Sequence, residues 1–115
     1  MKYMMLIAGS EDAWAVRSEE ELKALYGRIG EWWDEQERAG RIVEGHELQP
    51  TATATTVRIA QDGSATVTDG PFAEGKEMVG GYGILEVADL DEALAVASTW
   101  PAPDALEIRP IVVRD

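Results

Sequence analysis

The chain opens with Met1-Lys2-Tyr3-Met4-Met5-Leu6-Ile7-Ala8-Gly9, an apolar run that decides the fold. Successive side chains of a β-strand point to opposite faces of the sheet. Tyr3, Met5 and Ile7 therefore share one face of this strand, and the equally apolar residues between them share the other. A strand of this kind must be covered on both sides. The run is too short for a membrane span of about 20 residues, and acidic residues follow it where a signal peptide would be cleaved, so we expect a cytoplasmic protein.

A long amphipathic helix is predicted next. Ser18-Glu19-Glu20-Glu21 has the form of a capping box, in which the serine hydroxyl and the third glutamate satisfy free N–H groups of the first turn. Gly40 is expected to end the helix. The predicted apolar face repeats at spacings of three and four and consists of Leu22, Leu25, Tyr26, Ile29 and Trp33.

The rest of the chain adds five more strands, two of which form a hairpin, and one helix. Asp62-Gly63 lies between two alternating segments and predicts a hairpin turn. Asp89, with Glu92 three residues later, is expected to cap the second helix. The predicted strands cover residues 41–45, 55–60, 65–68, 78–87 and 107–113. The order β-α-β-(hairpin)-β-α-β predicts an α+β, ferredoxin-like subunit with residues 1–115 in a single domain.

The two predicted helices can cover only one face of the sheet. The other face would be a large exposed apolar patch unless a second subunit or an apolar ligand closes it. We therefore expect a homodimer whose sheets pack face to face and leave a pocket between them.

Composition excludes several kinds of partner and chemistry. The chain has 115 residues, with 10 Lys and Arg against 22 Asp and Glu, which gives a net charge of −12. Such an acidic surface repels phosphate backbones, so nucleic acid and anionic membranes are not expected as partners. Because the chain has no cysteine, it has no disulfide, thiol nucleophile, thiolate zinc site or iron–sulfur cluster. No cofactor is predicted.

The densest polar segment is Asp69-Gly70-Pro71-Phe72-Ala73-Glu74-Gly75-Lys76-Glu77, which is predicted to be a loop. Asp69 and Glu77 are candidates for acid–base catalysis, and Lys76 for holding an anionic or enolic oxygen. The same pattern is also typical of a solvated loop with surface ion pairs. Phe72 either lines a pocket or anchors the loop to the core.

Outside this loop the chemical candidates are few. His46, the only histidine, is a candidate proton shuttle because its charge changes near neutral pH; a surface role is the alternative. One histidine with scattered carboxylates has no metal-ligand spacing, so no metal site is predicted. The glycines of Gly80-Gly81-Tyr82-Gly83 indicate a bulge or a close backbone approach. Tyr82 is expected to line the pocket or to pack in the sheet.

Several motifs together resemble the YCII-related proteins of the Asp-Gly-Pro-Phe (DGPF) type. Besides the loop at Asp69, they include the opening strand, Leu48-Gln49-Pro50, Gly80-Gly81-Tyr82 and Glu107-Ile108-Arg109-Pro110. The resemblance implies a dimeric α+β barrel and a pocket lined by Asp69, Gly70, Pro71, Phe72, Lys76 and Glu77. A related branch removes halide from a chlorinated hydroquinone with a His–Asp pair whose histidine lies on the first helix. This chain has no histidine between Ser18 and Gly40, so that mechanism does not carry over.

Two functions are compatible with these residues. The first is a small dimeric pocket protein acting as a lyase or isomerase on a small polar aromatic or enolic compound. Asp69 would then move the proton, Lys76 would be the electrostatic anchor, and Phe72, Gly81 and Tyr82 would be walls. The second is a non-catalytic ligand-sensing or protein-interaction module, for which the resemblance suggests a link to a sigma-factor system.

Overall fold

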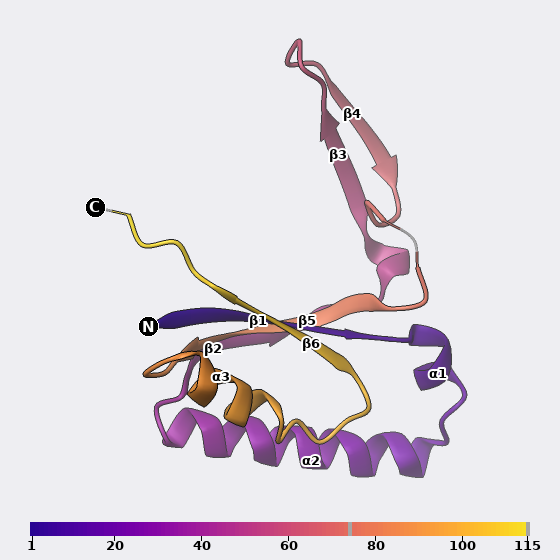
Figure 1. The fold of residues 1–115 in the computed structure, drawn as a ribbon. Coiled ribbons are helices and arrows are strands. Elements are labelled where there is room, and N and C mark those ends of the chain that lie inside the picture. The colour runs from indigo at the N-terminus through magenta and orange to yellow at the C-terminus, as the bar shows by residue number, and fades with distance from the viewer. Residues whose placement is uncertain (74, 115) are drawn as a thin grey trace.

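The computed structural model describes residues 1–73 and 75–114 and has the predicted ferredoxin-like order of elements (Figure 1). A four-stranded sheet and its helices form the body, and the β3–β4 hairpin is inserted between β2 and β5. The elements are β1 (Lys2–Gly9), α1 (Glu11–Ala15), α2 (Glu19–Arg38), β2 (Ile42–Glu47), a 3-10 turn (Thr51–Thr53), β3 (Thr55–Ile59), β4 (Ala65–Asp69), β5 (Met78–Glu86), α3 (Leu90–Ala97) and β6 (Ala105–Pro110).

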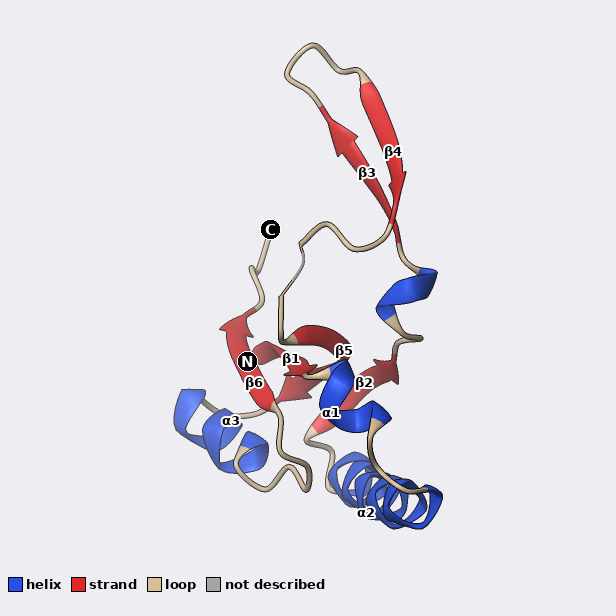
Figure 2. Ribbon diagram, turned by 90° about the vertical axis from the view of Figure 1, so that its right-hand side faces the viewer, coloured by secondary structure: helices blue, strands red, loops and turns tan. Residues whose placement is uncertain are grey.

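The main sheet is antiparallel, with strand order β2-β5-β1-β6. Helices α2 and α3 cover one of its faces, and none of the described helices covers the other (Figures 1 and 2). Tyr3, Met5 and Ile7 are buried beneath the helices, whereas Met4 and Leu6 are partly exposed on the opposite side. The two-faced pattern of β1 thus corresponds to one covered face and one open face. We call the uncovered side the open face of the sheet.

Helix α2 begins and ends where its capping residues predict. The Ser18 hydroxyl accepts a hydrogen bond of 3.1 Å from the Glu21 N–H, and Gly40 takes the positive φ of +74° that favours glycine after a helix. The buried side chains of α2 are Leu25, Trp32 and Gln36. The prediction that Tyr26 belongs to the inner face is wrong: its side chain lies at the flank of the helix and its hydroxyl donates to Glu47.

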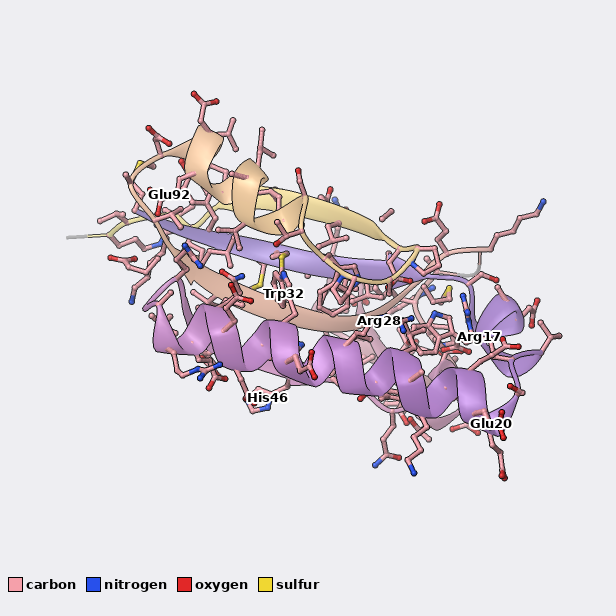
Figure 3. The ribbon with its side chains drawn as sticks, turned by 90° about the horizontal axis from the view of Figure 1, so that it is seen from below. Arg17, Glu20, Arg28, Trp32, His46 and Glu92 are labelled. Carbon is pink, nitrogen blue, oxygen red and sulfur yellow. The ribbon has the colours of Figure 1, made fainter. Side chains whose placement is uncertain are left out.

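Three tryptophans form the centre of the packing between helices and sheet. The rings of Trp32, Trp33 and Trp100 lie 5.1–6.2 Å apart and nearly perpendicular to one another, an arrangement that aromatic pairs favour. Figure 3, which views the molecule from the helical side, places Trp32 between α2 and α3. The Trp32 indole N–H donates to the Thr99 hydroxyl at 2.8 Å, so this buried donor is satisfied.

The glycine-rich part of β5 contains the predicted bulge and a close approach. Ile7 pairs with Gly81 and Ala8 with Val79, so Gly80 is the extra residue of a β-bulge. At Gly83 the ring of Trp33 occupies the space of a side chain: a Cβ there would lie 3.0 Å from Trp33 Cη2. The missing side chain of Gly83 therefore leaves room for the Trp33 ring to pack against the sheet.

The structure adds one helix and shortens one strand relative to the prediction. The acidic connector after β1 is the first turn of α1, because the Ser10 hydroxyl accepts from the Ala13 N–H and two acids follow at the positive end of the helix dipole. Strand β6 ends at Pro110, which cannot donate to a sheet ladder. The expected strand residues 111–113 lie outside the sheet.

The β3–β4 hairpin forms a separate two-stranded sheet that projects from the body on the side of the open face (Figures 1 and 2). Both faces of the hairpin are exposed along nearly its whole length in the subunit. Its apolar side chains Val57, Ile59 and Val67 are 56%, 66% and 63% exposed.

Candidate functional site

A cavity of about 260 Å³ lies between α1, the 3-10 turn and the loop that precedes β5. Glu11 and Asp12 line it from the first turn of α1, and Thr51 from the 3-10 turn. The loop contributes Pro71, Gly75 and Lys76 to the remaining wall, and β5 contributes its first residue, Met78. The cavity therefore brings one cation and two carboxylates together from segments that are far apart in the sequence.

Glu11 connects two of these segments. Its carboxylate accepts hydrogen bonds of 2.9 Å from both the backbone N–H and the hydroxyl of Thr51. These two bonds fix the orientation of the Glu11 side chain at the cavity rim. Among the described residues, no ion pair joins Asp12 or Lys76 to a neighbour. Asp12 and Lys76 are therefore the charged groups of the lining that remain available to a ligand.

The loop wall is held against the base of the hairpin by three hydrogen bonds. The Thr56 hydroxyl donates to the Gly70 carbonyl at 2.7 Å, and the Gly70 N–H donates to the Ala54 carbonyl at 2.8 Å. Arg58 donates to the Phe72 carbonyl at 2.9 Å. Gly70 has a φ of +102°, which favours glycine and turns the chain back towards the body. The hairpin thus positions the cavity wall.

The structure brings together only part of the predicted loop site. Pro71 and Lys76 line the cavity, and Gly70 is the turn immediately before them. Asp69 pairs with Thr55 at the end of β4, is exposed, and is not in the lining; Glu77 is also exposed outside it. The idea that Phe72 anchors the loop to the core is wrong for the subunit, because its side chain is 77% exposed.

His46 and Tyr82 form a second, separate group on the open face of the sheet. They are paired across β2 and β5, and their ring centroids lie 5.8 Å apart. The Tyr82 hydroxyl donates to Glu44 at 3.4 Å, and His46 Nε2 lies 3.7 Å from the same carboxylate. Desolvation raises the pKa of Tyr82, and the charge of Glu44 and the hydrogen bond to it act in the same direction. Gly81, beside this group, is buried within the sheet.

Residues Glu11, Asp12 and Thr51 of the cavity were not among the sequence candidates. The signal for the first two was present in Ser10-Glu11-Asp12, a capping serine followed by acids, which is a common start of a helix. The contribution of Thr51 depends on the path of the chain after β2, which no local pattern specifies.

A second hollow, of about 450 Å³, lies between α2 and α3 on the helical side. Gln36, only 4% exposed, accepts a hydrogen bond of 2.7 Å from Arg41 Nε at its floor. Glu92 lines the hollow from α3, where Figure 3 labels it. This hollow lies on the opposite side of the sheet from His46 and Tyr82.

In the described residues, no group of three or more His, Asp or Glu side chains is placed to hold a metal ion. None of the described helices has both the length and the apolar composition needed to cross a membrane.

The fold and the cavity define a ferredoxin-like α+β protein with a hairpin insertion that holds the loop wall of a small polar site. The sequence matches the YCII-related domain over residues 1–114, and the chain belongs to the YCII-related family. It is similar to an uncharacterized protein of Rhizobium meliloti (strain 1021), with 32% identity over 117 residues that cover 98% of this chain and 94% of that protein.

Proposed function

We propose that the protein is a homodimer that binds a small polar aromatic or enolic compound in the cavity beside Lys76. The dimer is supported by surface area. The subunit exposes 8222 Å², whereas a compact monomer of 12.5 kDa exposes about 6,200 Å². The excess of about 2,000 Å² is what each subunit of a large homodimer interface covers.

The open face of the sheet has the organisation of such an interface. Its centre is apolar, with Met4 and Leu6 of β1 beside Ile84 and Tyr82 of β5. Its rim is polar: Glu107 and Arg109 of β6 lie on one side, and Glu44 and His46 of β2 on the other. An apolar centre within a polar rim is typical of protein interfaces.

The observation that carries the ligand proposal is that Lys76 and two carboxylates line the same cavity. The charged lining side chains sum to −1, which disfavours a dianion. A neutral phenol or enol fits better, because its hydroxyl can donate to Asp12 while the developing anionic oxygen approaches Lys76.

A lyase or isomerase reaction on this ligand would use a carboxylate to move a proton and Lys76 to stabilise the enolate. Asp12 is the carboxylate best placed for that step. Asp69 and Glu77 would take part in this proton transfer only if ligand binding or the second subunit drew them into the cavity. His46 and Tyr82 lie on the open face, which the proposed dimer covers. The exposure of Asp69 and Phe72 favours a second function, non-catalytic ligand sensing or protein interaction, as in a sigma-factor system.

The test is a thermal-shift screen of small phenols, enolisable ketones and carboxylic acids, followed by calorimetric titration of the compounds that bind. We expect Lys76→Ala and Asp12→Asn each to weaken binding at least tenfold. Lys23→Ala, which removes the same charge from an exposed position of α2, should change it less than twofold. Equal affinity in all three variants would contradict the assignment of the cavity.

Turnover is separated from sensing by incubating the bound compound with the protein in D2O. Deuterium entering the carbon next to the carbonyl, lost in Asp12→Asn, is expected for a lyase or isomerase. Binding without exchange or product would favour the sensing function. An exchange rate equal in Asp12→Asn and the parent would instead exclude Asp12 as the base.

A further inference from the structure

The β3–β4 hairpin has two chemically different faces. Cross-strand pairing places Val57 opposite Val67 and Ile59 opposite Ala65, so these four side chains share one face. Thr56 and Arg58, with their partners Thr68 and Thr66, form the other face. We call the hairpin the arm, and the two sides its apolar face and its polar face.

In a self-contained protein the apolar face of the arm would be covered, but in this subunit it is the exposed one. The contacts to its own loop come from the polar face, through Thr56 to Gly70 and Arg58 to Phe72. The apolar face is bare, with more than half of each large side chain exposed. Because an isolated two-stranded hairpin is at best marginally stable in water, this face requires a partner to pack against.

The shape of the subunit indicates what that partner is. The radius of gyration is 16.3 Å, against about 13 Å for a compact chain of this length. The arm projects on the side of the open face (Figures 1 and 2), so whatever covers that face also meets the arm. The C-terminal tail after β6 rises on the same side (Figures 1 and 2), and its residues Val112 and Val113 are 68% and 89% exposed.

The arm is longer than the distance between two sheets that pack face to face. Sheets packed face to face lie about 10 Å apart, whereas a five-residue strand spans about 17 Å. In a dimer formed through the open face, each arm therefore extends past the partner's sheet and lies beside the partner's body. A second copy of this chain would cover the open face and lie beside the arm at the same time, because both are on the same side of the subunit (Figures 1 and 2).

We propose that the arm is an intersubunit clasp: its apolar face packs against the second copy and leaves the polar face to hold the cavity loop. This inference rests on the proposed homodimer. It adds that the element holding the cavity loop, through Thr56 and Arg58, is itself fixed by the partner, so that association steadies the loop wall of both cavities.

The direct test mixes subunits carrying ¹³C-labelled methyl groups with unlabelled subunits and records filtered nuclear Overhauser spectra. We expect intermolecular contacts to the methyl groups of Val57, Ile59 and Val67. In parallel, Val67→Asp places a charge on the apolar face, and Thr66→Asp places the same charge on the polar face. Val67→Asp should weaken dimerisation at least tenfold, and Thr66→Asp less than twofold.

The possible failures are distinguishable. A dimeric parent without intermolecular contacts to the arm, and with both variants dimerising equally, would overturn the clasp and leave the homodimer standing. A monomeric parent would overturn both. If Val67→Asp alters the fold by circular dichroism, the methyl contacts of the unmodified protein still decide the question.

Discussion

Gly45 of β2 lies directly against the ring of Trp33 of α2. A Cβ placed on Gly45 would come within 2.5 Å of Trp33 Cη2 and Cζ3 and within 2.9 Å of the Tyr82 carbonyl. The Trp33 ring therefore occupies the space that a side chain at Gly45 would fill. The close approach allows α2 to pack its tryptophan pair onto the sheet without displacing β5.

Gly45→Ala should therefore destabilise the protein. Overpacking of a filled site costs about 1–3 kcal/mol, and here the added methyl group meets both an aromatic ring and a backbone carbonyl. Urea denaturation measures the change in the free energy of unfolding.

The matched control is Gly27→Ala in α2, where a Cβ meets nothing within 4 Å. Because alanine is the better helix former, this variant should gain up to about 1 kcal/mol. Equal stability of the two variants would show that the contact between Trp33 and Gly45 is not tight.

Thr99→Val tests the tryptophan cluster from the polar side. The substitution keeps the shape of Thr99 but removes the acceptor of the buried Trp32 N–H. An unsatisfied buried donor costs about 1–3 kcal/mol, so the midpoint of urea denaturation should fall. Thr99→Ser keeps the oxygen and should cost less; if it costs as much as the valine variant, the hydrogen bond is not the cause.

Tyr26 should lose its proton only above its ordinary pKa. Desolvation raises this pKa first, followed by the hydrogen bond to Glu47 and the charge of that carboxylate. The unfolded chain releases the proton near the model-compound value of 10.0, while the folded protein still holds it. The stability from protonated Tyr26 is therefore fully present below that pH and is lost as pH rises through the folded pKa.

The measurement is the tyrosinate absorbance of the parent minus that of Tyr26→Phe during an alkaline titration. Glu47→Gln should bring the pKa of Tyr26 partly back, because burial, the largest cause, remains. A Tyr26 titration at or below 10.0 would contradict the hydrogen bond and the partial desolvation at this position.

Local patterns in the sequence predicted most of the fold because its elements begin and end at strong signals. Ser18, Asp89, Gly40 and the Asp62-Gly63 turn each specify a local conformation that no tertiary contact overrides. Helix α1 was missed because five residues are too few for a periodic pattern. The predicted apolar face of α2 included Tyr26 and omitted Trp32, whereas the structure buries Trp32 and leaves Tyr26 exposed.

The candidate site was predicted less well, for a physical reason. Lys76 and Pro71 were found because they lie in a dense polar loop, but the opposite wall comes from Glu11, Asp12 and Thr51. These segments meet only through the tertiary path of the chain, which no local spacing encodes. The amphipathic arm was visible as a hairpin, but only the structure shows that its apolar face is bare.

The most direct measurement of the central claim is the mass of the protein in solution by light scattering at micromolar concentration. Because the open face and the arm leave about 2,000 Å² more surface exposed than a compact monomer has, we predict a mass of about 25 kDa, twice the 12.5 kDa of one chain. A mass of 12.5 kDa at these concentrations would contradict the homodimer and, with it, the clasp that the arm is proposed to form.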